Sequence, residues 1–288
     1  MILKDFKNYL TGELSEVYPK TEIDSFFFLL IEEYLGLERI DTVLKPDFKI
    51  NEEHLSILNT AIIRLKKEEP IQYIIGKTEF FGYTLFVNEN TLIPRPETEE
   101  LVEWVIQEVS SLKFEIDCEQ LNILDIGTGT GCIPISLSKN LSEVNISAID
   151  VSKEALKMAK KNAELNNVNI NFIETDILNI NKLPKKYDII ISNPPYVREL
   201  EKVEIQNNVL ENEPHLALFV SDDDPLIFYS KIADLAKEYL SKNGMLFFEI
   251  NQYLGKETKE MLKEKGFKNI ELRKDLFKND RMIKIINN

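Results

Sequence analysis

The sequence predicts an α/β protein: a doubly wound, mostly parallel sheet that follows a smaller N-terminal helical domain and a β-hairpin linker. Three observations predict this class. Apolar residues recur at helical spacing in residues 1–77, strand-like residues flank a glycine in residues 78–95, and strand-like and helix-like segments alternate through residues 96–288. Such alternation is typical of a parallel sheet with helices on both faces.

The first domain is predicted to be a small helical bundle. Residues 22–35 are rich in apolar side chains and are followed by Gly36, a residue that often ends a helix. Asn51 is placed to cap a further helix that carries one apolar stripe and that Pro70 stops. In residues 78–95, aromatic and aliphatic residues around a glycine indicate two strands joined by a turn.

Five strands and a closing hairpin are expected in the C-terminal domain. The strand candidates are Asn122–Ile126, Asn145–Ile149, Ile170–Glu174, Asp188–Ser192 and Met245–Ile250. Helical stretches lie between them, and the last two apolar stretches, Phe267–Leu272 and Arg281–Ile286, are expected to pair as a hairpin.

The composition excludes several classes of protein. Of the 288 residues, 43% are hydrophobic and 29% are charged, a balance typical of globular proteins rather than disordered chains. The net charge of −14 disfavours a nucleic-acid-binding protein, because that binding needs basic side chains to displace counterions from phosphates. This argument from net charge does not apply to a local groove lined by basic side chains.

No metal site and no membrane span are expected. The two cysteines, Cys118 and Cys132, and the two histidines, His54 and His215, show no metal-ligand spacing. The longest wholly apolar run, Phe26–Ile31, is far too short to span a bilayer. The low cysteine count and the absence of a signal-peptide pattern at the start predict a cytoplasmic protein.

A glycine-rich turn follows the first strand of the predicted sheet. It consists of Gly127, Thr128, Gly129, Thr130 and Gly131. Glycines at this place let the backbone turn sharply and let a ligand approach the main chain. Asp150 stands 23 residues after Gly127 and ends the next strand, where its carboxylate can accept hydrogen bonds from both hydroxyls of a ribose.

Two classes of cofactor use this geometry. A dinucleotide fingerprint requires its third glycine where this chain has Cys132, with Gly131 one residue early. S-adenosylmethionine has no pyrophosphate and needs only a loop that its amino-acid part can cross, and Asp125 suits the neighbourhood of its amino group. The turn therefore favours S-adenosylmethionine over NAD, with a glycine turn that binds no ligand as the structural alternative.

The fourth strand ends in the tetrapeptide Asn193-Pro194-Pro195-Tyr196. The two prolines stiffen the backbone and remove two N–H donors. The side-chain oxygen of Asn193 and the carbonyl of Pro194 can then accept both hydrogens of one planar NH2 group, against which Tyr196 packs. This grip would aim a weakly nucleophilic nitrogen at a sulfonium methyl group without a strong base. A strand end made rigid by proline is the alternative.

The sequence resembles the bacterial release-factor glutamine methyltransferases, also called PrmC or HemK, over nearly its whole length. Four segments carry the resemblance: 70–82, 92–99, 127–132 and 193–196. The last two segments occur across many methyltransferases. The first two are more specific, because DNA and ribosomal RNA methyltransferases with a similar tetrapeptide generally lack them.

The resemblance implies a Rossmann-like class I fold and a defined reaction. A methyl group would pass from S-adenosylmethionine, leaving S-adenosylhomocysteine, to the side-chain amide nitrogen of the glutamine in the Gly-Gly-Gln motif of class 1 peptide chain release factors. Residues 127–131, Asp150 and Asn193 would contact the cofactor, residues 193–196 would hold the glutamine amide, and residues 1–77 would dock the release factor. The chain departs from some relatives at Ile177, where an aromatic residue would cover the adenine.

An adenine-N6 or guanine-N2 methyltransferase acting on DNA or ribosomal RNA is the main alternative, because base flipping would deliver a planar amine to the same tetrapeptide. A binding module without catalysis would have no need of this tetrapeptide, and an NAD-dependent oxidoreductase is disfavoured by the glycine spacing. Arg95, between two prolines, either belongs to a helix start or borders the substrate channel. A monomer is the default expectation.

Overall fold

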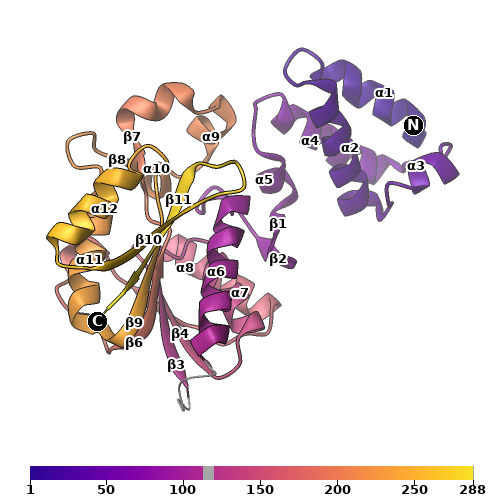
Figure 1. Cartoon of the computed structure of the whole chain (residues 1–288). Coiled ribbons are helices and arrows are strands. Elements are labelled where there is room, and N and C mark those ends of the chain that lie inside the picture. The colour runs from indigo at the N-terminus through magenta and orange to yellow at the C-terminus, as the bar shows by residue number, and fades with distance from the viewer. Residues whose placement is uncertain (113–119, 288) are drawn as a thin grey trace. The chain divides into compact units, whose positions relative to one another are not determined.

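The computed structural model describes residues 1–112 and 120–287, so that Cys118 lies outside the described residues. The chain forms two compact units (Figure 1). The helical unit comprises Met1–Gly76 with Gln206–Asn212, and the sheet unit comprises Lys77–Ile205 with Glu213–Asn288. That residues 206–212 join the helical unit was not anticipated from the sequence.

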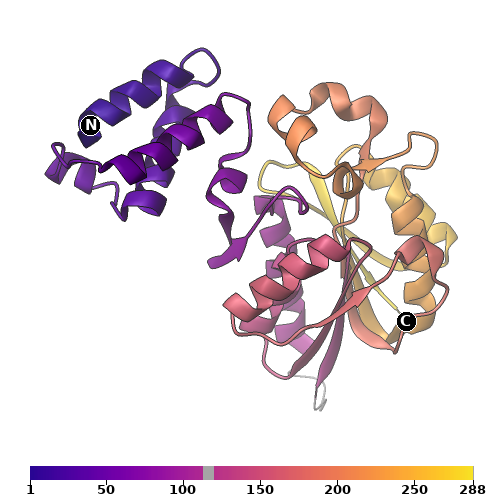
Figure 2. The same ribbon diagram turned by 180° about the vertical axis from the view of Figure 1, so that it is seen from behind.

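The helical unit has one apolar core, formed by side chains between Leu3 and Ile74 (Figure 2, indigo to purple). Its helices are α1 (Leu3–Leu14), α2 (Lys20–Leu35), α3 (Asp41–Leu44), α4 (Glu52–Leu65), α5 (Ile71–Ile75) and the late α9 (Asn207–Asn212). As predicted, α2 ends at Gly36, which has a φ of +63°. Asn51 caps α4, because its side chain accepts a hydrogen bond from the His54 N–H at 2.8 Å.

An antiparallel hairpin opens the sheet unit, as the pattern around Gly82 predicts. It consists of β1 (Lys77–Phe80) and β2 (Tyr83–Phe86). Phe81 and Gly82 form the turn with φ values of +52° and +76°, the two-residue turn whose twist matches that of the strands. The Glu99 carboxylate accepts a hydrogen bond from the Phe81 N–H at 2.6 Å, which stabilises this unusual conformation for a phenylalanine.

The sheet runs in the order β10-β11-β9-β6-β3-β4-β5. Its strands are β3 (Leu121–Ile126), β4 (Val144–Asp150), β5 (Asn171–Glu174), β6 (Tyr187–Ser192), β9 (Leu240–Glu249), β10 (Asn269–Lys274) and β11 (Asp280–Ile286). The strands β3, β4, β5, β6 and β9 pair in parallel, and β11 lies antiparallel between β9 and β10. The predicted mostly parallel sheet with a closing hairpin is confirmed.

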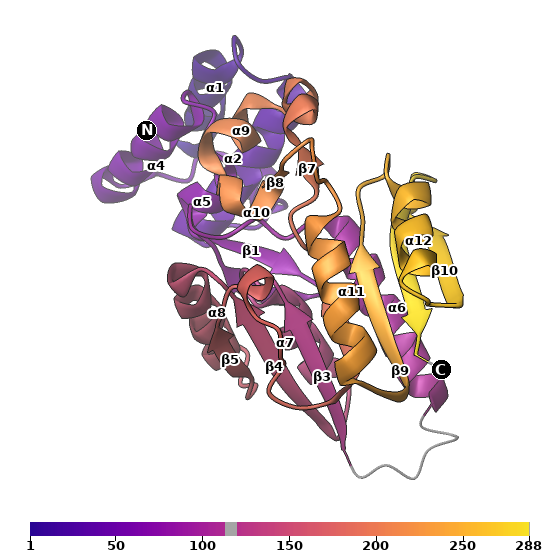
Figure 3. The same cartoon turned by 90° about the vertical axis from the view of Figure 1, so that its left-hand side faces the viewer.

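Helices cover both faces of the sheet (Figures 1 and 3), because successive side chains of a strand point to opposite faces. One face packs against α6 (Pro96–Leu112), α7 (Cys132–Asn140) and α8 (Lys153–Leu165), and the other against α11 (Ile227–Tyr239) and α12 (Gly255–Glu264). Ile123 belongs to the first core and its neighbour Leu124 to the second. The connections contain η1 (Ile177–Asn179), β7 (Val197–Arg198), η2 (Glu199–Glu204), α10 (His215–Leu218) and β8 (Phe219–Val220).

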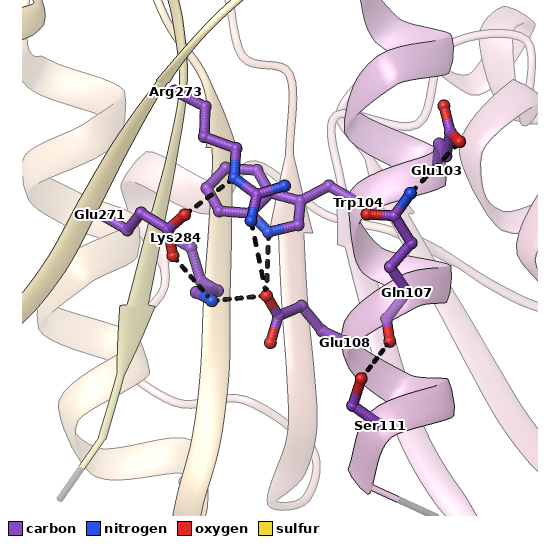
Figure 4. Close-up of polar contacts among 8 residues, drawn as sticks. All are labelled: Glu103, Trp104, Gln107, Glu108, Ser111, Glu271, Arg273 and Lys284. Carbon is purple, nitrogen blue, oxygen red and sulfur yellow. Dashed lines mark hydrogen bonds and ion pairs between the residues drawn. The ribbon is translucent and has the colours of Figure 1, made fainter.

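A tryptophan and a cluster of charges hold α6 against the closing hairpin (Figure 4). The buried Trp104 donates its ring N–H to Glu108 at 3.0 Å, and the Arg273 guanidinium lies 3.9 Å from the centre of the Trp104 ring. Lys284 of β11 bridges Glu108 and Glu271 with N–O distances of 2.6 and 2.9 Å. These contacts fix the position of α6 relative to the sheet, and with it the position of the first turn of that helix.

Asn162 of α8 joins the hairpin to the glycine-rich turn. Its side chain is fully buried, and its oxygen accepts a hydrogen bond from the Phe86 N–H at 2.7 Å. Its nitrogen donates to the carbonyls of Phe86 and Thr130, both at 2.9 Å. The side chain therefore satisfies three backbone groups and supports the turn from the side of α8.

Replacing Asn162 with alanine is expected to lower the free energy of unfolding by about 2 kcal/mol, because the backbone groups of Phe86 and Thr130 lose their partners in the interior. Asn166→Ala, at the C-cap of α8, is the matched control. The Asn166 side chain donates to the exposed Thr84 carbonyl at 3.0 Å, which water can satisfy instead, so a loss below about 1 kcal/mol is expected. Urea unfolding measures both changes, and equal losses would contradict this account.

Candidate functional site

The sheet unit contains a pocket of about 300 Å³ at the carboxyl edge of its parallel strands. Gly127 follows β3, Asp150 ends β4 and Asn193 follows β6, and all three line this pocket. They meet because parallel strands bring their carboxyl ends to the same edge of a sheet. Residues 89–92 and 175–178, with Pro214, Leu216 and Ala217, form further walls.

The Asp150 carboxylate holds the glycine-rich turn and keeps capacity for further donors. Its two oxygens accept hydrogen bonds from the backbone N–H groups of Gly129 and Ser152, both at 2.8 Å. Burial raises the pKa of Asp150, while these backbone hydrogen bonds lower it. An ionised carboxylate has about four acceptor positions, so Asp150 keeps capacity for a hydroxyl group of a ligand.

Gly127 and Gly129 leave space in the pocket that a side chain would occupy. Their φ values of +79° and +54° lie in the left-handed region, which favours glycine. A Cβ atom at Gly127 would lie 3.9 Å from the Asn193 carbonyl oxygen, between two walls of the pocket. The turn therefore provides a cradle that fits a ligand crossing from Asp150 towards Asn193.

Three other residues that the sequence assigned to the cofactor are absent from the pocket lining: Thr128, Thr130 and Gly131. Both threonines are buried, at 3% and 1% exposure. A Cβ atom at Gly131 would meet the Ala159 Cβ at 3.2 Å, so this glycine allows α8 to approach the turn closely. The structure thus gives these residues a packing role, and their contact with a cofactor stays a prediction.

Asp125 is a fully buried carboxylate next to the turn. Within residues 1–112 and 120–287, neither its oxygens nor the Thr128 hydroxyl has a hydrogen-bond partner of ordinary geometry. Burial raises the pKa of Asp125 to about 7, against a lowering by the Thr128 hydroxyl and with a further increase from the Asp150 carboxylate. A cationic group brought by a ligand would favour the ionised form.

The Asn193 side chain is oriented by α6. Its nitrogen donates to the Thr98 hydroxyl oxygen at 3.2 Å, and the Thr98 hydroxyl donates to the Glu249 carboxylate at 2.6 Å. The second Glu249 oxygen accepts a hydrogen bond from the Tyr196 hydroxyl at 3.0 Å. Burial raises the pKa of Glu249, while Thr98, Tyr196 and Arg281 lower it. Because the Asn193 nitrogen is engaged, its oxygen is the end of the amide left for the pocket.

Tyr196 differs from the other three residues of the tetrapeptide. Asn193, Pro194 and Pro195 line the pocket, whereas Tyr196 does not. Its hydroxyl contacts Glu249, and its ring packs against the core under α11. The predicted packing of this ring against a substrate amide therefore stays a prediction, and its observed contact is with the carboxylate that holds Thr98.

Ile177 lines the pocket, at the position where some relatives carry an aromatic residue. It begins η1, which Asp176 caps by accepting a hydrogen bond from the Leu178 N–H at 2.9 Å. Ile177 is 7% exposed, so it presents an apolar edge rather than a broad face to the pocket.

Arg95 directly precedes α6, as a helix start requires, and it also joins two segments that lead into walls of the pocket, so its role at the border of a substrate channel stays a prediction. Its guanidinium pairs with the buried Glu213 at 2.7 Å, and Glu213 also accepts a hydrogen bond from the Ile93 N–H at 3.3 Å. The segments on either side of this ion pair continue into two stretches that line the pocket, residues 89–92 and residues Pro214, Leu216 and Ala217.

Sequence reasoning missed Thr98 and Glu249 as site residues. Thr98 lies in the segment 92–99, which carries part of the family resemblance, and Glu249 is the last residue of β9. A signal was present in each case: an acidic residue at the carboxyl end of a buried parallel strand lies at the edge where ligands bind. The wall at 89–92 was also missed, because its residues are typical of an ordinary turn.

Two family models match the chain: the PrmC N-terminal domain over residues 8–76 and the methyltransferase small domain over residues 109–218.

The structure also bears on metal binding and on membrane spans. No group of three or more potential metal ligands occurs among the residues that the structure describes. Across the same residues, no helix is both long and apolar enough to cross a membrane.

Two solved structures share the fold of this chain at 17% sequence identity. The hMettl16 catalytic domain, solved with an RNA hairpin, gives a TM-score of 0.54 and covers 83% of each chain. A T. thermophilus 16S rRNA N2 methyltransferase, solved with AdoMet and guanosine, gives a TM-score of 0.53 over 74% of this chain and 50% of that chain. At this level of identity they show the fold alone.

Relatives identified by sequence match this chain at much higher identity and over most of its length. A release factor glutamine methyltransferase of Flavobacterium psychrophilum is 55% identical over 288 residues, covering 99% of each chain. The enzymes of the same name from Bacteroides thetaiotaomicron and Lactococcus lactis are 41% and 42% identical, over 96% and 82% of this chain and 96% and 84% of theirs. Because similarity of this degree runs through both the helical unit and the sheet unit, the chain belongs to the family of release factor glutamine methyltransferases.

Proposed function

We propose that this protein methylates the side-chain amide nitrogen of the glutamine in the Gly-Gly-Gln motif of class 1 peptide chain release factors, in the cytoplasm where these factors act. The methyl donor is S-adenosylmethionine. The observation that carries the proposal is the Asn193 amide, whose nitrogen is engaged by Thr98 so that its oxygen is free to accept a hydrogen bond in the pocket.

The residues of the pocket fit the donor. Asp150 has acceptor positions for the ribose hydroxyls, Gly127 and Gly129 give room for the amino-acid part, and Ile177 with Leu178 offers apolar atoms to the adenine. When bound, S-adenosylmethionine supplies a methyl group made electrophilic by the positively charged sulfur, and S-adenosylhomocysteine is the product.

The tetrapeptide binds the amide of the substrate. The Asn193 side-chain oxygen and the Pro194 carbonyl accept the two hydrogens of the glutamine NH2 group. An amide nitrogen is a weak nucleophile because its lone pair is delocalised into the carbonyl. Two acceptors direct that lone pair towards the methyl group and stabilise the positive charge that develops on nitrogen. One proton then leaves the nitrogen after the methyl group has been transferred.

The helical unit is the part of the chain to which we assign docking of the release factor. Its residues 8–76 match the PrmC N-terminal domain, which supports a role particular to this family. The short helix α3 exposes apolar side chains at and next to it: Ile40, Val43 and Leu44, at 56%, 74% and 68%. Exposed apolar side chains that cluster in this way are typical of a contact surface.

A nucleic-acid substrate is the second candidate, and the observations disfavour it. The net charge of −14 opposes binding to phosphates. The two nucleic-acid enzymes of similar fold share 17% identity with this chain, whereas the relatives that match it from end to end are release factor glutamine methyltransferases. The same pocket could admit a planar base amine, so the substrate experiment includes nucleic acid.

The substrate test offers radiolabelled S-adenosylmethionine to the protein with one of three acceptors. These are a class 1 release factor, the same factor with Gln→Ala in its Gly-Gly-Gln loop, and bulk DNA or ribosomal RNA. Label is expected on the unaltered factor alone, because only its loop presents the carboxamide that the Asn193 and Pro194 acceptors bind. Label on nucleic acid, or label that persists on the altered factor, would overturn the proposal.

Asn193→Ala is expected to reduce turnover by about 10³-fold, because one of the two acceptors that orient the reacting nitrogen is lost. Affinity for S-adenosylhomocysteine is expected to change little, since Asp150 and the glycine-rich turn are intact. Asn145→Ala, an exposed asparagine in β4 near the opposite edge of the same sheet, is the control and should retain activity. Turnover of Asn193→Ala near that of the control would contradict the assigned role.

Asp125 is expected to make stability depend on pH. Its pKa is about 7 in the folded protein against an ordinary value of 3.8, so the folded state holds this proton more tightly than the unfolded state. The stabilisation is therefore fully present below about pH 4 and is lost as the pH rises towards 7. Asp125→Asn cannot ionise and should lack this fall. Urea unfolding at a series of pH values compares the two proteins, and parallel profiles would refute the prediction.

A further inference from the structure

The hydrogen bonds from Asn193 to Glu249 run in one direction only. The Thr98 hydroxyl donates to the Glu249 carboxylate at 2.6 Å. The Thr98 hydroxyl has one hydrogen, and this bond uses it. Towards Asn193, at 3.2 Å, the Thr98 oxygen can therefore only accept. Asn193 must present its NH2 end to Thr98, and its oxygen lies at the other end of the amide.

The shape of the site does not select this orientation by itself. The oxygen and the NH2 group of an asparagine side chain are nearly equal in size, so packing tolerates either end. If the Asn193 side chain turned over, its NH2 group would face the NH2 group of the substrate and donor would meet donor. A directional hydrogen bond is the means by which the protein distinguishes the two orientations.

We propose that Thr98 and Glu249 are positioning residues that determine which end of the Asn193 amide faces the substrate. The inference rests on the proposed function, because a substrate with an NH2 group is what needs an acceptor at this position. Neither residue touches the reacting atoms in this account. Both act through Asn193, and their arrangement favours a carboxamide over a carboxylate as the group that enters the pocket.

This arrangement of hydrogen bonds depends on residue 249 being a carboxylate. It accepts from two hydroxyls, Thr98 and Tyr196, one on each oxygen. A glutamine at this place would offer one acceptor and one donor, so one hydroxyl would have to reverse its direction. Glu249 is 1% exposed and Thr98 is 2% exposed, which leaves little water to satisfy a reversed group.

The positions of the two residues are set by the fold rather than by each other. Thr98 is in the first turn of α6, where its N–H donates to the Arg95 carbonyl at 3.1 Å, and the Trp104 cluster holds the same helix further along. The backbone carbonyl of Glu249 accepts a hydrogen bond from the Tyr229 hydroxyl at 3.2 Å. Asn193 is therefore oriented by groups that are anchored independently of it.

The test compares Thr98→Val with Thr98→Ser. Valine keeps the shape of threonine but has no hydroxyl, whereas serine keeps the hydroxyl and loses a methyl group. With a release factor as substrate, kcat of Thr98→Val is expected to fall about tenfold, the loss of one oriented hydrogen bond, while Thr98→Ser stays within about threefold of the parent. Affinity for S-adenosylhomocysteine, measured by calorimetry, is expected to be unchanged in both variants.

A second measurement reads the orientation without turnover. A release factor whose Gly-Gly-Gln glutamine is replaced by glutamate presents a carboxylate, which the Asn193 oxygen repels in the parent protein. In Thr98→Val the Asn193 amide is free to turn over. The ratio of the protein's binding affinities for the glutamine form and the glutamate form is therefore expected to fall. Glu249→Gln is expected to lower the same affinity ratio. In the double variant, the loss of this preference is expected to be smaller than the sum of the losses in the two single variants.

The outcomes separate this inference from the proposed function. If the parent protein fails to methylate the release factor, the proposed function is wrong. If the parent is active and Thr98→Ser loses as much as Thr98→Val, the role of Thr98 is packing and the inference is overturned. An unchanged preference between the glutamine and glutamate forms in both Thr98→Val and Glu249→Gln overturns it as well, whatever the melting temperatures of the variants.

Discussion

The alignment of four parallel strands is the constraint on which the site depends. Ile126 of β3 pairs with Ile149 of β4 and with Ser192 of β6, and Ser192 in turn pairs with Phe248 of β9. The next residue of each strand or its loop is Gly127, Asp150, Asn193 or Glu249. A shift of one strand by one residue would turn its side chains to the other face and remove its member from this row. The register of the sheet thus brings together the glycine-rich turn, the Asp150 carboxylate, the Asn193 amide and the buried Glu249 carboxylate.

The helices complete what the strand ends begin. The sheet by itself does not orient the Asn193 amide, because the acceptor of its nitrogen, the Thr98 hydroxyl, does not belong to a strand end. That acceptor comes from α6, which the Trp104 cluster joins to the closing hairpin. Asn162 plays the corresponding part for α8 by supporting the glycine-rich turn. Residues outside the pocket lining therefore determine the geometry of residues that line it, and the antiparallel hairpin at the end of the chain contributes to a site that it does not line.

Much of the fold followed from local patterns. The predicted strand Asn122–Ile126 corresponds to β3 (Leu121–Ile126), and Asn145–Ile149 to β4 (Val144–Asp150), because buried parallel strands are continuous apolar runs. Gly36 and Asn51 marked helix ends correctly, since capping depends on the residue itself and its close neighbours. Gly127, Asp150 and Asn193 were likewise placed in the pocket from motifs that occupy a few consecutive residues.

What the sequence by itself determined about this protein is thus the order of its elements, the glycine-rich turn, the rigid tetrapeptide and the family to which they point. Only the tertiary structure decided that Tyr196 contacts Glu249, that Thr128, Thr130 and Gly131 pack away from the pocket lining, and that Arg95 reaches Glu213. The physical reason is separation along the chain: the Thr98–Glu249 hydrogen bond joins residues 151 positions apart. The direction of a hydrogen bond between such residues depends on where the whole sheet and its helices bring them, and no local pattern encodes it.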